Sequence, residues 1–112
     1  MPTKYFLLFG TPATDIKRVK SDLEEKLNIR FDERDSAYSG IYYMHRSANT
    51  DMVRVETNYQ EWDQDWIMPD FKHYQILISF STNSNNQKDI DLFISSVLSS
   101  SDKLKLLKNE KS

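Results

Sequence analysis

Apolar residues recur at helical spacing in two stretches of the chain, one near each end. The apolar positions are Ile16, Val19, Leu23 and Leu27 in the first stretch and Ile90, Phe93, Ile94, Val97 and Leu98 in the second. Such spacing gathers the apolar side chains on one side of a helix, which is typical of a helix lying on a core. The pattern predicts two amphipathic helices. The first is expected to begin at Thr11–Pro12, with the Thr11 hydroxyl as its cap.

The remaining apolar positions form short runs that favour strands. Residues 4–9 are almost entirely apolar, as in a strand buried on both faces. Residues 40–45, 51–57 and 74–80 carry the alternating or β-favouring residues of half-buried strands. Two shorter runs are also strand candidates: 29–31, and 103–108, which fits a last edge strand or a fraying tail.

Two one-sided helices and several half-buried strands are most simply combined in a two-layer α+β sandwich. We expect an antiparallel sheet of about five strands with both helices packed on one face. The chain has 112 residues, enough for one core and too few for two. We therefore predict a single domain over residues 1–108 and a disordered tail over 109–112.

The composition excludes some classes of function but does not identify the function itself. With 15 Lys and Arg against 17 Asp and Glu, the net charge is −2, whereas proteins that bind nucleic acid usually carry a positive excess. Strand aromatics such as Tyr42, Tyr43 and Phe6 suggest an RNA platform, but the flanking Lys and Arg of that module are missing. The chain has no cysteine, which excludes disulfides, thiolate zinc sites and cysteine nucleophiles. Neither a signal peptide nor a 20-residue apolar span is evident, so we expect a cytoplasmic protein with no nucleic-acid or membrane partner.

Candidate catalytic groups are few. The two histidines, His45 and His73, lack a recognisable metal-ligand or triad motif. The two glycines, Gly10 and Gly40, do not form a phosphate-binding loop. We therefore expect a protein that is not an enzyme and uses neither a metal nor a cofactor. A small hydrolase that pairs one histidine with a carboxylate is an alternative.

The most unusual segment is residues 56–71, which is acidic and aromatic. It contains five carboxylates, both tryptophans and no Lys or Arg. Tryptophan and tyrosine dominate the energetics of protein interfaces, and carboxylates around them steer a basic partner. The segment predicts a docking surface for a basic protein. The candidate residues are Glu61, Trp62, Asp63, Asp65, Trp66 and Asp70.

A second, smaller candidate patch contains Asp32, Glu33 and Asp35, although four adjacent charged residues also fit a solvated turn. An alternative also exists for the tryptophans, which could fold back as a lid over the end of the sheet. Their spacing of four would allow both to share one turn of helix.

Three segments resemble small bacterial immunity proteins. They are a Tyr-x-Gly-x-Tyr-Tyr strand within residues 37–43, a strand ending in Asn after an acidic residue in 53–59, and an aromatic lead into a long apolar strand in 71–78. The resemblance covers roughly residues 37 to 98. It implies a cytoplasmic, non-catalytic inhibitor that binds a cognate toxin domain of a contact-dependent growth inhibition or related polymorphic toxin system. Many such toxins are nucleases with basic clefts. A small regulatory or anti-defence adaptor that binds another cellular protein is the alternative.

Overall fold

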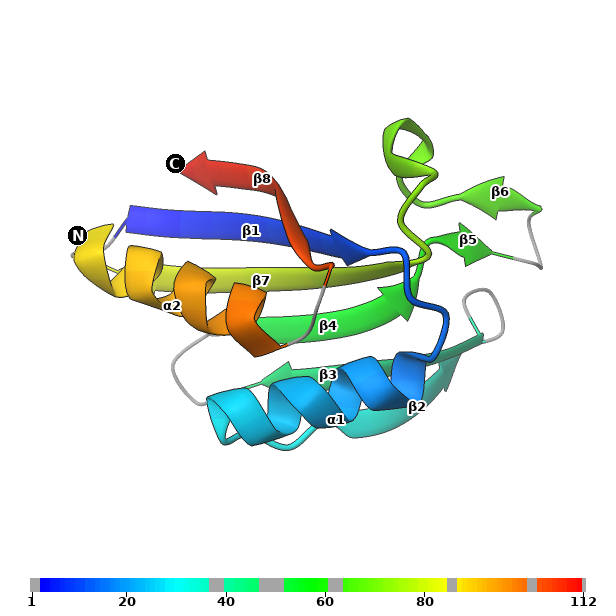
Figure 1. Cartoon of the computed structure of the whole chain (residues 1–112), viewed down its shortest axis with the longest axis horizontal. Coiled ribbons are helices and arrows are strands. Elements are labelled where there is room, and N and C mark those ends of the chain that lie inside the picture. Colours follow the sequence, from blue (N-terminus) through cyan, green and yellow to red (C-terminus); the bar gives the residue numbers. More distant parts are fainter. Residues whose placement is uncertain are drawn as a thin grey trace.

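A computed structural model of the chain describes residues 3–36, 40–46, 52–60, 64–84, 87–100 and 103–111 (Figure 1). In these ranges six strands form one sheet in the order β2-β3-β4-β7-β1-β8, with every neighbouring pair antiparallel. The sheet strands are β1 (Thr3–Thr11), β2 (Asp32–Ser36), β3 (Gly40–Arg46), β4 (Met52–Thr57), β7 (Ile76–Ser84) and β8 (Lys105–Lys111). The other elements are α1 (Ile16–Leu27), α2 (Gln87–Ser100), the two-residue strands β5 (Tyr59–Gln60) and β6 (Asp65–Trp66), and a 3-10 turn, η1 (Pro69–Phe71).

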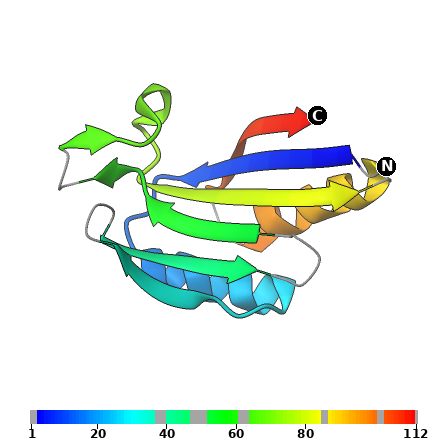
Figure 2. The same ribbon diagram turned by 180° about the vertical axis from the view of Figure 1, so that it is seen from behind.

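Both helices lie on the same face of the sheet, and the view from behind shows the strands in front of them (Figures 1 and 2). This arrangement confirms the predicted two-layer α+β sandwich. The core lies between the layers, where Phe80 packs edge-on against Phe9 of β1 and Phe93 of α2, with ring centroids 5.4 and 4.6 Å apart. Edge-to-face aromatic packing adds to the stabilisation that burial alone provides.

The strand β1, which lies between β7 and the edge strand β8, is buried on both faces, as its apolar run predicts. Tyr5, Leu7 and Phe9 point into the helix-covered core. On the opposite face Leu8 is also buried, and Gly10 lies beneath Tyr74 and Leu107. The segment before β7 thus crosses the second face of the sheet at one end.

The first helix begins later than the sequence suggests. Thr11 is the last residue of β1, and its hydroxyl accepts a hydrogen bond from the Ala13 N–H at 3.2 Å. The residue that caps α1 is Asp15, whose Oδ1 accepts from the Arg18 N–H at 3.2 Å. The prediction of a helix start at Thr11–Pro12 is therefore wrong, because pairing with β7 extends β1 to Thr11.

Two further expectations are corrected at the edges of the sheet. Residues 29–31 connect α1 to the sheet, and the strand that follows is the charged run Asp32–Ser36, which was expected to be a solvated turn. Residues 109–111 were expected to be disordered, but they pair with β1 as the end of β8, where Lys111 lies opposite Tyr5. In both places backbone pairing with a neighbouring strand outweighs the polar side-chain pattern.

Candidate functional site

The acidic and aromatic segment is positioned by Asn58, which follows β4 directly and is fully buried. Its backbone N–H donates to the Gln75 carbonyl at 2.8 Å, and its own carbonyl accepts from the Ile67 N–H at 2.8 Å. Asn58 therefore joins both ends of the segment that leaves β4 and returns to β7. We call the described part of this segment, residues 59–60 and 64–75, the projection (Figure 1).

The Asn58 side chain uses its amide group fully. Its Nδ2 donates to the carbonyl oxygens of Phe71 at 2.9 Å, Tyr74 at 3.0 Å and Met68 at 3.4 Å. Its Oδ1 accepts from the Met68 N–H at 2.8 Å. A buried amide with such satisfied groups fixes the backbone around it, because a lost bond to the Met68 N–H would leave that donor without its acceptor. The carbonyls of Met68 and Phe71 also accept from the N–H groups of Phe71 and Tyr74. Asn58 thus holds the turn around η1 in place.

An aromatic pair lies on the outer part of the projection. Tyr59 and Trp66 face each other across the small β5–β6 hairpin, with ring centroids 5.1 Å apart. Tyr59 is 36% exposed, and Trp66 is half-buried with the Lys72 ammonium 6.0 Å from its ring centroid. Trp66 is in an extended strand, so the idea that it shares a helical turn with Trp62 is wrong for this residue. Trp62 itself lies outside the described residues, as do Glu61 and Asp63.

Two candidate carboxylates on the projection are exposed. Asp65 and Asp70 form no ion pair with any residue in the described ranges, and the Asp65 carboxylate only accepts a hydrogen bond from the Trp66 N–H at 2.8 Å. Glu56, the first carboxylate of the acidic segment, differs from them. It lies in β4 and is buried against Arg54, with Nε and Oε2 2.6 Å apart. The acidic surface of the projection is therefore made by carboxylates beyond Asn58.

The second predicted patch, Asp32, Glu33 and Asp35, does not form one surface. These residues are exposed but lie on the edge strand β2, where successive side chains point to opposite faces. Glu33 is paired opposite Tyr43, whose hydroxyl donates to Oε1 of Glu33 at 3.1 Å, while Asp32 lies opposite Met44. Charged side chains on an edge strand also protect it from pairing with other chains.

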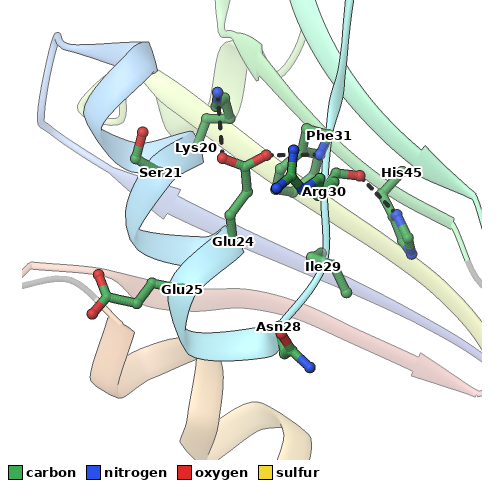
Figure 3. Close-up of a pocket in the computed structure, with 9 residues that line it drawn as sticks. All are labelled: Lys20, Ser21, Glu24, Glu25, Asn28, Ile29, Arg30, Phe31 and His45. Carbon is green, nitrogen blue, oxygen red and sulfur yellow. Dashed lines mark hydrogen bonds and ion pairs between the residues drawn. The ribbon is translucent and has the colours of Figure 1, made fainter.

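A groove of about 1030 Å³ lies between the end of α1 and the β2–β3 side of the sheet (Figure 3). It is lined by Glu24 and His45 among others, so it is the place where the alternative hydrolase would need its catalytic pair. His45 Nδ1 lies 2.9 Å from the Arg30 carbonyl, and Glu24 Oε2 accepts from the Phe31 N–H at 2.9 Å. The other Glu24 oxygen pairs with Lys20 Nζ at 3.3 Å.

Glu24 is thus held by structural contacts. Burial alone would raise the pKa of its carboxyl, but the Phe31 N–H and the Lys20 ammonium outweigh that effect and lower the pKa below its ordinary value. A carboxylate held in its charged form suits a structural cap better than a proton donor. In the described ranges no hydrogen bond joins a histidine to a carboxylate, and His73 is exposed in the turn after η1.

Two residue groups were not found from the sequence: Asn58, and the cluster formed by Arg54, Glu56 and Tyr42. The arginine lies over the Tyr42 ring at 4.3 Å from its centroid. An Asn directly after an alternating strand and before an aromatic segment was the available signal for the first group. No group of three or more His, Asp or Glu side chains in the described ranges could hold a metal ion.

The described helices are all too short or too polar to cross a membrane.

Comparisons with known proteins do not identify a family. Neither a protein-family model nor a curated protein matches this chain.

Proposed function

We propose that this chain is a cytoplasmic, non-catalytic inhibitor of the immunity-protein type, which binds a toxin domain through the projection. The observation that carries the proposal is the combination on the projection of two exposed carboxylates, Asp65 and Asp70, with the aromatic pair Tyr59 and Trp66. Neither carboxylate forms an ion pair with a residue that the structure describes. Aromatic side chains supply rigid contact area, and carboxylates around them favour a basic partner surface. The resemblance of three segments to immunity proteins supports the same function.

The contacts of Asn58 support this proposal because they fix the projection before any partner binds. Binding to a surface that is already ordered costs less conformational entropy than binding to a flexible loop. The partner's complementary surface would be rich in Lys and Arg, as in the substrate cleft of a nuclease. Covering such a cleft would block substrate access without any chemistry by the inhibitor.

The test is co-expression with the product of the adjacent gene, followed by purification and stopped-flow measurement of association. Reversing the charges with Asp65→Lys and Asp70→Lys should slow association by about tenfold or more and weaken its dependence on salt. The control is Glu25→Lys together with Asp89→Lys, which reverses two exposed acidic residues on the helices. This control should associate at the wild-type rate.

Unchanged association of the Asp65→Lys, Asp70→Lys protein would exclude the projection as the docking surface. Failure of the adjacent gene product to bind at all would favour the alternative, an adaptor that recognises another cellular protein.

A further inference from the structure

The face of the sheet opposite the helices is open over β3 and β4, where no described element crosses it (Figure 2). Tyr43, Val53 and Val55 point into the core, so the alternating neighbours on these strands point to the other face. Asp32 and Arg34 of β2 are paired with Met44 and Tyr42 of β3, so their side chains lie on the same face. We call this surface the open face. Its residues are Asp32, Arg34, Tyr42, Met44, Arg46, Met52, Arg54 and Glu56.

The open face is basic although the whole chain is slightly acidic. It carries three arginines and two carboxylates, and Glu56 is already paired with Arg54. Arg34 and Arg46 are exposed at its border, and neither forms an ion pair with a described residue. The remaining side chains are one tyrosine and two methionines, all half-buried. Arginine, tyrosine and methionine are the residue types enriched in protein interfaces.

Two contacts within the chain already restrict the Arg54 side chain, which favours its binding to a carboxylate of a partner. Its guanidinium carbon lies over the Tyr42 ring at 4.3 Å from the ring centroid, and its Nε lies 2.6 Å from Glu56 Oε2. These two contacts restrict the side chain, which is 31% exposed. A guanidinium that is already held by an aromatic ring and an ion pair loses less entropy when it binds a planar carboxylate.

The chain itself carries a surface that complements the open face. Asp65 and Asp70 on the projection form no ion pair in the described ranges, and the projection also carries one cation, Lys72, 6.0 Å from the Trp66 ring centroid. The half-buried Trp66 is an aromatic ring of the kind that methionine sulfur contacts favourably. The net charge of −2 gives little repulsion between two copies. Opposite charges on separate surfaces of one chain allow a reciprocal dimer, in which each surface is used once on each copy.

We propose that the open face binds the projection of a second copy of this chain, with Arg34, Arg46 and Arg54 facing Asp65 and Asp70. Tyr42, Met44 and Met52 receive Trp66. The interaction does not depend on the proposed inhibitor function. It has one consequence for that function: a dimer covers the projection, so the toxin partner and the second copy compete for it.

Sedimentation velocity of the purified chain tests this inference without any partner. At about 50 mM salt the wild-type chain should form a dimer whose population rises with concentration, and at about 500 mM salt the dimer should weaken. Reversing the arginines with Arg34→Glu and Arg46→Glu should weaken dimerisation by about tenfold or more. The control Lys17→Glu, Arg18→Glu makes the same change in net charge on the exposed side of α1 and should dimerise like the wild type.

Mixing two variants with opposite charge reversals tests whether these two surfaces contact each other or whether dimerisation depends only on the overall charge. The Arg34→Glu, Arg46→Glu protein and the Asp65→Lys, Asp70→Lys protein should each be monomeric alone. Mixed together, they should form a one-to-one dimer, because the acidic open face of one then meets the basic projection of the other. The mixture also shows that both variants are folded.

Three results would overturn the inference: a wild-type chain that stays monomeric at low salt, a dimer that survives the arginine reversals, or a mixture that forms no heterodimer. Any of them leaves the proposed inhibitor function intact, since that function is measured by association with the toxin partner.

Discussion

Asn58 is the residue on which the position of the projection depends. Replacing it with alanine removes four side-chain hydrogen bonds to Met68, Phe71 and Tyr74 and leaves the Met68 N–H without its acceptor. We expect Asn58→Ala to lower the free energy of unfolding by about 2–4 kcal/mol, measured by urea denaturation. Asn109→Ala, at an exposed position on β8, is the matched control and should change stability by less than about 0.5 kcal/mol. Equal losses in the two variants would contradict the role given to Asn58.

Glu56 contributes stability at low pH that is lost as the pH rises, which is the opposite of the usual behaviour of a carboxylate. Burial raises the pKa of its carboxyl above the ordinary value of 4.5, and the Arg54 guanidinium offsets only part of that rise. The folded state therefore favours the protonated form. The stability that this preference provides is fully present below 4.5 and is lost as the pH rises through the raised pKa.

Glu56→Gln removes this titration while keeping an acceptor for Arg54. The wild-type chain should therefore lose stability relative to the Gln variant as the pH is raised from about 4 to about 7, as measured by chemical denaturation at each pH. Two parallel pH profiles would show that Glu56 keeps its ordinary pKa in the folded chain.

At the residue scale the sequence identified exposed groups better than buried ones. Asp65 and Asp70 are exposed as the docking hypothesis requires, while their binding role stays a prediction. The position of Asn58 gave a sequence signal, but its role and the Arg54–Glu56 pair could not be found from the sequence, because they depend on partners placed by the fold. The groups bound by the Asn58 side chain lie 10 to 16 residues further along the chain.

At the scale of the elements, β1 is packed closely against its neighbours at Gly10. A Cβ atom there would lie 2.7 Å from Leu107 Cδ1 and 2.8 Å from Tyr74 Cγ, which is closer than real carbon contacts allow. Gly10→Ala should therefore destabilise the fold by about 1–3 kcal/mol, measured by thermal or urea denaturation. The control is Ser81→Ala, a half-buried position on the same face of β7. A stable Gly10→Ala protein would mean that Tyr74 and Leu107 can move away from β1.

The elements that periodicity marks strongly were predicted well, and the strongly charged ones were not. Both helices and the apolar strand β1 follow from apolar spacing alone. The strand β2 and the end of β8 are charged, and their structure comes from backbone pairing with β3 and β1, which a side-chain pattern does not encode. The hairpin β5–β6 was missed because it contains only two pairs of residues.

In the whole molecule, charged residues of opposite sign lie on separate surfaces, which the small net charge does not reveal. The net charge is −2, yet the described projection carries Asp65 and Asp70 against Lys72, and the open face carries three arginines against two carboxylates. Sequence composition could not separate these two surfaces, because the open face collects residues from three strands. Its basic character emerges only when the pleat and the register of β2, β3 and β4 are known.

The position of β1 between β7 and β8 affects how the chain folds. This strand is synthesised before either of its neighbours, and its pairs join Thr3 to Ser84 and Tyr5 to Lys111. Its apolar side chains can therefore be buried only after distant parts of the chain have been made and have paired with it. Sheets built from such long-range pairs form slowly. During that interval the unpaired strand is open to aggregation or to chaperones. A cell that needed this protein quickly would have to keep a folded supply in advance.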